Sequence, residues 1–202
     1  MSCISTLRRC RASSVRKHDV HRALACLCLG GRTAEARPKV SLSSSGNAME
    51  AVIQAADPAD AEHIRLLMRG VIESSIDLPL RGEILTNVEA NLMAWLDRSV
   101  ECVHLVATSH QSIIGVVLVK DFWNLCSLFV EPSRQGRGVG RALVEDAAAA
   151  CASRGTRKAL VLNAYPSAIG FYERLGFSLA ESGRHLPSGI RRMERPLERR
   201  GA

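Results

Sequence analysis

Three glycines at alternate positions, Gly136, Gly138 and Gly140, join an apolar run at Asn124–Val130 to a segment of helical spacing that reaches about Ser153. This order predicts a strand, a tight turn and then a helix. Glycine lets a ligand approach the backbone closely, and the free N–H groups of a helix's first turn attract an anion. The segment therefore predicts a cradle for a phosphate or pyrophosphate group.

The spacing of these glycines excludes two common phosphate-binding loops. A Walker A loop requires a lysine followed by serine or threonine, and this segment contains no lysine. A dinucleotide-binding fingerprint requires Gly-x-Gly-x-x-Gly at the start of its domain, whereas these glycines follow Gly-x-Gly-x-Gly in mid-domain. A plain glycine-rich connection remains an alternative, although Arg134, Arg137 and Arg141 place positive charge around the glycines.

The segment Gln135-Gly-Arg-Gly-Val-Gly140 resembles the acyl-CoA-binding signature of the GCN5-related N-acetyltransferase (GNAT) superfamily, Gln/Arg-x-x-Gly-x-Gly/Ala. The resemblance implies that backbone amides from Gln135 to Arg141 hold the pyrophosphate of CoA. It also implies that the end of the preceding strand pairs with the pantetheine arm. The CoA-binding residues implied in this way are Phe129, Val130, Arg134, Gln135, Gly136, Arg137, Gly138, Val139, Gly140, Arg141 and Ser167.

A second pattern follows another apolar run, at Arg157–Leu162. It reads Ala168-Ile-Gly-Phe-Tyr-Glu-Arg-Leu-Gly-Phe177 and resembles a later motif of the same superfamily, Ala-x-x-Phe-Tyr-x-x-x-Gly-Phe, at every specified position. With two motifs in the expected order, the resemblance covers residues 49–197. Many members carry Asn where Tyr165 stands, so the resemblance does not supply a polar contact to the pantetheine arm at that position.

Tyr172 is the residue to which the resemblance assigns chemistry. When an amine attacks acetyl-CoA, the tetrahedral intermediate expels a thiolate. A phenol with a pKa of about 10 is matched well enough to a thiol with a pKa of about 8.5 to donate a proton to it. The resemblance implies that Tyr172 is this general acid, while the alternative is a ring that packs in the core with its hydroxyl bonded outward.

The attacking amine must also lose a proton, directly or through water. Glu131, Asp121, Glu83 and His104 are the candidate bases, and the residues alone do not select among them. Cys126 lies in the strand beside the predicted site. We expect it to be a small core residue, because direct transfer within a ternary complex needs no acyl-cysteine.

The remaining periodicity predicts the elements around these motifs. Asp57-Pro58 is typical of a helix start, a second helix is expected at about Glu83–Arg98 after an ordered loop at Ser74–Gly82, and Gly155 is expected to end the third in a left-handed conformation. Runs rich in β-formers predict strands at Cys102–Thr108, Ile113–Val119, Asn124–Val130 and Arg157–Leu162. The resemblance adds the fold class: an α/β (α+β) GNAT-type acyltransferase fold, a mixed twisted sheet flanked by helices, with CoA where two middle strands splay.

The charge of the chain divides it into two parts. The net charge of +7 suggests nucleic acid or an anionic membrane as partner, but residues 1–48 hold nine basic and two acidic side chains while residues 49–202 hold 18 of each. We therefore expect a basic, Ser/Arg-rich leader at 1–48, disordered or absent from the native protein, and an N-acetyltransferase domain at 49–202. The expected location is cytoplasmic, or an organelle if the leader is a transit peptide.

We expect the chain to be an enzyme that moves an acetyl group from acetyl-CoA, as co-substrate, to a primary amine of a small molecule or peptide by direct attack in a ternary complex. No metal is expected, because the seven cysteines form no metal-binding pattern. Nucleic acid is not expected as partner, because the charges of residues 49–202 cancel. No membrane is expected either, since no apolar run approaches the roughly 20 residues that span a bilayer; a homodimer is left open. The alternative is a non-catalytic acyl-CoA-binding or partner-binding domain on the same fold.

Overall fold

A computed structural model of the chain describes residues 40–41, 51–75, 78–181, 186 and 189–198. These residues belong to one compact unit, Glu35–Ala202. The expected leader lies outside them except for Val40–Ser41, which form a short strand, β1, antiparallel to β2 (Val52–Ala55). The start of the domain at Met49 stays a prediction.

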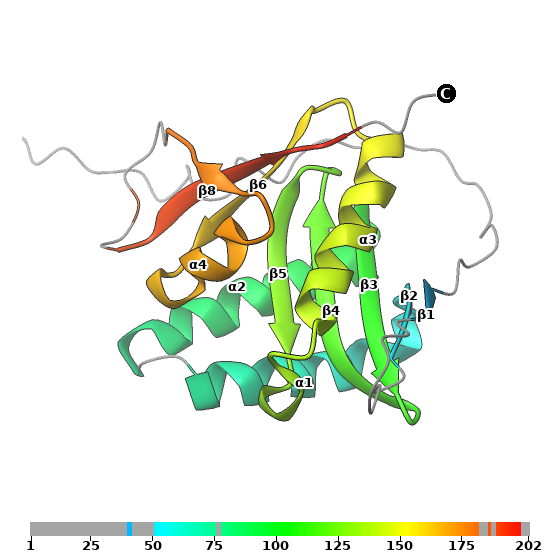
Figure 1. The fold of residues 1–202 in the computed structure, drawn as a ribbon. Helices are drawn as coiled ribbons and strands as arrows, with labels where there is room; N and C mark the ends of the chain where they lie inside the picture. The colour runs from blue at the N-terminus through cyan, green and yellow to red at the C-terminus, as the bar shows by residue number, and fades with distance from the viewer. Residues whose placement is uncertain (1–39, 42–50, 76–77, 182–185, 187–188, 199–202) are drawn as a thin grey trace, which may run out of the picture. The chain divides into compact units, whose positions relative to one another are not determined.

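Eight strands form one mixed sheet in the order β1-β2-β3-β4-β5-β6-β8-β7 (Figure 1). All neighbouring strands are antiparallel except β5 and β6, which run parallel. The other strands are β3 (Cys102–Ser109), β4 (Ser112–Lys120), β5 (Asn124–Val130), β6 (Ala159–Ala164), β7 (Ser178–Leu179) and β8 (Arg191–Pro196). The mixed sheet that the sequence predicted is confirmed.

Helices cover both faces of this sheet (Figure 1). On one face, α1 (Ala61–Ser75) and α2 (Leu78–Leu96) share a buried apolar cluster with Val116 of β4. On the other, α3 (Val139–Arg154) and α4 (Ile169–Glu173) share a cluster with Val117. Because successive strand side chains point to opposite faces, β4 must be apolar at both positions.

The first helix begins as the sequence predicts. Asp57 caps a 3₁₀ turn, Pro58–Asp60, that leads into α1. The Asp57 carboxylate accepts a hydrogen bond from the Ala59 N–H at 3.0 Å, and the Asp60 carboxylate accepts one from the Asp57 N–H at 2.9 Å. This reciprocal cap satisfies two N–H groups that have no partner within the helix.

The second helix begins earlier than predicted, at Leu78 rather than at about Glu83. The loop expected at Ser74–Gly82 is therefore mostly helical, and only residues 76–77, which lie outside the described residues, separate α1 from α2. The segment predicted as a loop contains Pro79. A proline in the first helical turn lacks only an N–H that would have no intrahelical acceptor, so it does not delay the helix.

Gly155 ends α3 for a different reason from the expected one. Its φ of −80° and ψ of 153° are extended rather than left-handed. A Cβ at this position would lie 3.1 Å from both the Cβ and the carbonyl oxygen of Phe122. The glycine is therefore required by close packing against the turn between β4 and β5.

We expect Gly115→Val to destabilise the fold, because Gly115 lets α3 lie close to β4. A Cβ there would lie 3.0 Å from Leu143 Cδ1, 3.2 Å from Val139 Cγ1 and 3.3 Å from the Phe129 carbonyl oxygen. Overpacking of this kind costs about 1–3 kcal/mol, which lowers the melting temperature of a chain of this size by roughly 2–12 °C. Thermal unfolding measures the effect. The control is Gly82→Val, at a helical glycine with nothing within 4 Å; equal shifts for the two variants would contradict the close approach of α3.

Candidate active site

The parallel strands β5 and β6 meet at one point and then separate. They pair at Asn124 and Val161, where the Val161 N–H also donates to the Trp123 carbonyl oxygen at 2.8 Å. Among the described residues β5 forms no further pair with β6, whereas it stays paired with β4 as far as Gly115 and Val130. From Leu125 to Val130, the edge of β5 on the β6 side therefore has no strand partner.

The unpaired edge contains a β-bulge at Cys126. Ser127 pairs with Leu118 and Leu125 pairs with Val119, which leaves Cys126 as the extra residue. Its thiol donates to the Asn124 carbonyl oxygen at 3.3 Å, and burial raises the pKa of the thiol to about 11. Cys126 is thus a protonated, half-buried thiol rather than a thiolate. The bulge bends the strand at the point where it leaves β6.

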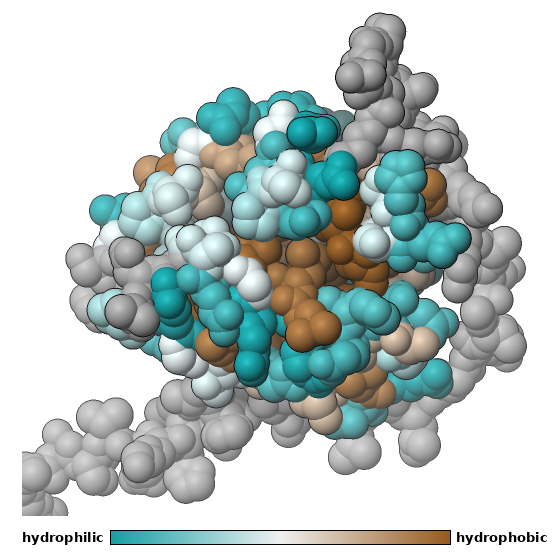
Figure 2. Space-filling view, turned by 90° about the horizontal axis from the view of Figure 1, so that it is seen from below, coloured by the Kyte–Doolittle hydropathy of each residue, from teal (hydrophilic) through white to brown (hydrophobic). Residues whose placement is uncertain are grey.

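An apolar hollow lies on the side of the molecule where β5 ends. Figure 2, which looks from that side, shows it framed by hydrophilic residues. The apolar side chains left half-buried by the end of β5 and by α4 are Leu128, Phe129, Val130, Ile169 and Phe171. An unpaired strand edge beside apolar side chains is suited to an elongated ligand with its own amide groups.

The glycine loop after β5 presents a row of N–H groups. Pro132–Arg134 form a 3₁₀ turn, and Gly136 and Gly138 have positive φ angles of 73° and 84°. Gly138 caps α3, whose first hydrogen bond runs from the Ala142 N–H to the Gly138 oxygen at 3.0 Å. Within the described part of the chain, the N–H groups of residues 136–141 donate to no backbone oxygen. Together with the helix dipole, they favour an anion at this loop.

Side chains fix the loop and add positive charge. The Gln135 amide donates from Nε2 to the Val130 carbonyl oxygen at 3.0 Å, which ties the loop to the end of β5. Arg134 lies 3.7 Å from Glu131, whereas Arg137 and Arg141 are exposed. Two exposed guanidinium groups beside a row of N–H donors are well suited to phosphate oxygens.

The fold brings the two sequence motifs into contact. A Cβ at Gly140 would lie 3.3 Å from Phe171 Cζ of α4 and 3.6 Å from Val130 Cγ2 of β5. Ser167 is exposed in the 3₁₀ turn Pro166–Ala168 between β6 and α4. The sequence predicted the two motifs separately and did not predict that α4 packs on the first turn of α3. The glycine at position 140 is the sequence signal that is consistent with this close packing.

Tyr172 is buried on α4, the helix that contacts the glycine loop. Its ring lies edge-on to those of Phe171 and Phe177, with centroids 5.1 and 5.4 Å away. The side chain is 9% exposed, and its hydroxyl forms no hydrogen bond with any described residue. Burial raises the pKa of this phenol well above its usual value, so it is protonated throughout the neutral range.

The structure separates the four candidate bases. Asp121 lies in the turn before β5, at the end where β5 and β6 are paired, and Glu131 lies in the glycine loop. His104 of β3 is buried against Trp95 of α2, with ring centroids 4.3 Å apart. Glu83 is exposed near the start of α2.

We expect His104 to make the protein less stable in acid. Burial lowers the pKa of His104 to about 4, against about 6.5 in an unfolded chain, so the unfolded state binds the proton more readily between these values. Stability therefore falls as pH drops from about 6.5 to about 4, by up to about 1.4 kcal/mol per pH unit from this group. Urea unfolding at pH 7 and pH 5 should show a smaller loss for His104→Leu than for the wild type. The exposed His63 gives the control, His63→Leu, which should keep the wild-type loss.

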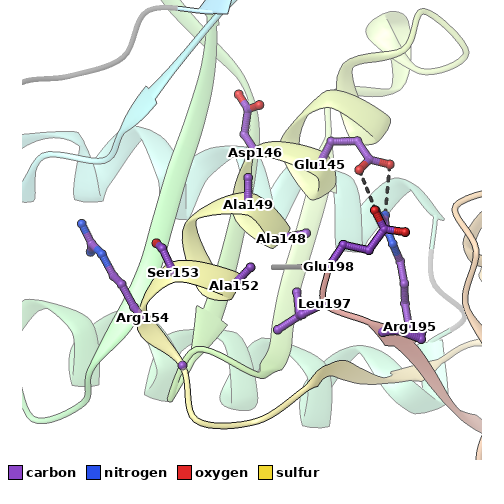
Figure 3. Close-up of a pocket in the computed structure, with 12 residues that line it drawn as sticks. Glu145, Asp146, Ala148, Ala149, Ala152, Ser153, Arg154, Arg195, Leu197 and Glu198 are labelled. Atoms are coloured by element: carbon purple, nitrogen blue, oxygen red, sulfur yellow. Dashed lines mark hydrogen bonds and ion pairs between the residues drawn. The ribbon is translucent and has the colours of Figure 1, made fainter. Parts of the chain in front are cut away.

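A separate pocket lies elsewhere in the described part of the chain. It has a volume of about 790 Å³ and lies between β8 and the half of α3 remote from the glycine loop (Figure 3). Arg195 donates two hydrogen bonds to Glu145 there, at 3.0 and 2.7 Å, and much of the α3 wall consists of Ala148, Ala149 and Ala152. Because this ion pair already satisfies both of its members, we place the candidate site at the glycine loop and the open edge of β5.

Three other observations concern the described residues alone. Cys102, Cys126 and Cys151 are free thiols. No group of His, Cys, Asp or Glu side chains in this part of the chain is arranged to hold a metal ion. None of its helices is both long enough and apolar enough to cross a membrane.

Comparison with known families agrees with this architecture. A family model described as an acetyltransferase (GNAT) domain matches residues 90–192, a segment that includes both the glycine loop and the α4 motif. The chain therefore belongs to the GNAT family of acetyltransferases. The resemblance noted in the sequence is confirmed.

Solved structures show the same fold. PaiA N-acetyltransferase of Thermoplasma acidophilum, in complex with coenzyme A, is 15% identical with a TM-score of 0.60, over 73% of this chain and 99% of that one. A GCN5-related N-acetyltransferase of Rhodopseudomonas palustris is 21% identical with a TM-score of 0.60, over 72% and 94%. YncA of Salmonella typhimurium, solved with acetyl-CoA, is 19% identical with a TM-score of 0.51, over 75% and 96%. No curated protein sequence matches the chain.

Proposed function

We propose that the protein is an N-acetyltransferase that moves the acetyl group of acetyl-CoA to a primary amine by direct attack in a ternary complex. The observation that carries this proposal is that the unpaired edge of β5 leads directly into the exposed N–H row of the glycine loop. One continuous stretch of backbone thus offers amide pairing for an extended arm and donors for a pyrophosphate. CoA complexes of PaiA and YncA support the choice of ligand.

In this proposal the CoA contacts come from β5, the glycine loop and the turn before α4. Phe129 and Val130 pair with the pantetheine arm through their backbone, and Ser167 lies on the other side of it. Backbone amides of the loop bind the pyrophosphate, with the guanidinium groups as counter-charges. The residues of the loop are Arg134, Gln135, Gly136, Arg137, Gly138, Val139, Gly140 and Arg141.

The chemistry requires one bond to form and one to break. The neutral amine nitrogen attacks the thioester carbon, and the intermediate loses a proton from nitrogen to water as its C–S bond breaks. The CoA sulfur takes its proton from the Tyr172 hydroxyl, which is then reprotonated from solvent, so that the products are the amide and free CoA thiol. The protonated state of Tyr172 and its lack of a hydrogen-bond partner among the described residues support this role.

A thiol-release assay on the full-length chain tests the proposal. Acetyl-CoA is supplied with a panel of primary amines, and a sample without amine corrects for the protein's own cysteines. We expect amine-dependent thiol release and an acetylated product detectable by mass. Binding of CoA without release on any amine would favour the non-catalytic acyl-CoA-binding alternative, and absence of CoA binding would refute both.

A further inference from the structure

A groove of about 530 Å³ lies along α1, and we call it the α1 groove. One wall is the face of α1 that recurs at helical spacing from His63 to Val71. The hairpin between β3 and β4 supplies Ile113 to the other wall, and the start of the glycine loop supplies Glu131 and Pro132. In Figure 1 these parts meet at the lower end of β4 and β5.

The ladder between β4 and β5 separates the α1 groove from the candidate active site. Val130 pairs with Gly115, and the Glu131 N–H donates to the Ile114 carbonyl oxygen at 2.9 Å. The candidate site uses the opposite edge of β5, which faces β6. The α1 groove is therefore a cavity that the proposed acetyl transfer does not use.

The floor of the α1 groove is apolar and only partly covered. Leu67 and Ile113 pack half-buried on the cluster beneath α1 and α2, and Val71 is buried beside them. Leu66, on the same wall, is 58% exposed. An alkyl chain in the groove would remove these surfaces from water, and the volume is typical of sites for small molecules.

The formal charges around the α1 groove have one sign. Asp60 and Glu131 each place a carboxylate in its walls, and none of its described lining residues is a lysine or an arginine. The pocket beside β8 differs, because two arginines line it. The Asp60 carboxylate accepts one hydrogen bond, from the uncharged Asp57 N–H, and keeps further lone pairs. The Glu131 carboxylate lies 3.7 Å from Arg134, farther than a hydrogen bond.

We propose that the α1 groove is a second ligand site, which takes a small molecule with a cation at the end of an alkyl chain. The chain lies over Leu66 and Ile113, and the cation lies beside the carboxylates of Asp60 and Glu131. An uncharged alkyl ligand gains only the apolar contact, and an anionic one meets two charges of its own sign. This inference does not rest on the proposed function.

Octyltrimethylammonium is the probe, because its quaternary nitrogen has no N–H and cannot be acetylated. On the full-length chain, calorimetric titration should give one saturable site with a Kd of about 0.05–2 mM, with or without saturating CoA. Octanoate, an anion of similar chain length, should bind at least about tenfold more weakly. Absence of saturable binding, displacement of the probe by CoA, or equal affinity for octanoate would overturn the proposal.

Gly70→Leu tests the position of the ligand by filling the groove. Gly70 lines the groove, and a Cβ there would meet no atom within 4 Å, so the folded helix has room for the leucine. We expect the affinity for the probe to fall at least about tenfold. Gly82→Leu is the matched control, at a helical glycine with the same open space that does not line the groove. Equal affinities for the two variants would refute the location.

A double variant, Asp60→Asn with Glu131→Gln, tests the charge. Each amide keeps the size of the side chain and an oxygen that accepts hydrogen bonds, so the cap at the Asp57 N–H is retained. The variant should bind octyltrimethylammonium about three- to tenfold more weakly and should lose most of the discrimination against octanoate. Undiminished discrimination would show that the two carboxylates do not recognise the cation.

Sedimentation of the same preparations tests a second copy of the chain as the occupant. We expect the wild type and Gly70→Leu to have the same oligomeric state. Self-association of the wild type that Gly70→Leu abolishes would assign the α1 groove to a contact between copies and would overturn the small-molecule site.

Discussion

Tyr172→Phe is expected to lower turnover by about 10- to 1,000-fold while the affinity for acetyl-CoA stays the same. Phenylalanine keeps the ring between Phe171 and Phe177, so the packing of α4 is preserved. Only the hydroxyl is lost, and with it the proposed proton donor for the departing thiolate. Because the wild-type hydroxyl forms no hydrogen bond with the described residues, its removal should not lower stability.

Initial rates and CoA binding, measured on the same preparations, check this expectation. Tyr165→Phe is the matched control, since it removes the other phenolic oxygen of the chain while keeping its ring. It should retain most of the turnover. Wild-type turnover in Tyr172→Phe would discard the general-acid role. The raised pKa of Tyr172 adds a second criterion: its ionisation should not reduce activity anywhere in the neutral range.

Gly138→Val is expected to weaken acetyl-CoA binding by roughly 5- to 30-fold. Gly138 has a φ of 84° at the N-cap of α3, a conformation that costs an L-residue with a Cβ about 1–2 kcal/mol. Space is not the obstacle, because no atom lies within 4 Å of the position of a Cβ. The loop must therefore either bear the strain or relax, and a relaxed loop no longer aims its N–H groups at one anion.

Calorimetry or quenching of tryptophan fluorescence by CoA measures the loss of affinity. Gly70→Val is the control, because Gly70 lies in a helix, has no positive φ, and has nothing within 4 Å of the position that a Cβ would take. We expect that variant to bind CoA as the wild type does. Equal affinity for Gly138→Val would mean that the left-handed backbone at this cap is not needed for the ligand.

Most of the fold follows from local sequence patterns. The alternating and continuous apolar runs located the strands, and Asn124–Val130 was predicted to the residue. The errors lie where two physical effects compete at one residue. The loop predicted at Ser74–Gly82 contains Pro79, which α2 in fact accommodates in its first turn. Gly155 was predicted to end α3 in a left-handed conformation. It is instead required because Phe122 packs too close to leave room for a side chain, and no local sequence pattern indicates this contact.

The sequence predicted the two motifs of the candidate site, but not that they pack against each other to form one surface. Local spacing predicted the glycine loop at the start of α3 and the helix that carries Tyr172. The contact of Gly140 with Phe171 joins residues that are distant in sequence and depends on tertiary packing. The same holds for His104, whose burial against Trp95 makes it a poor proton acceptor despite its residue type.

The single pairing of β5 with β6 also bears on how the protein unfolds. Strands β1 to β5 form one block of backbone hydrogen bonds, and β6, β8 and β7 form another. Side chains hold the blocks together, among them the Arg195–Glu145 pair between β8 and α3 and the contact of Phe171 with Gly140. The ligand-free sheet can thus open along this line with the loss of few ladder bonds. A ligand that touches both blocks couples their unfolding into one cooperative transition and raises its midpoint.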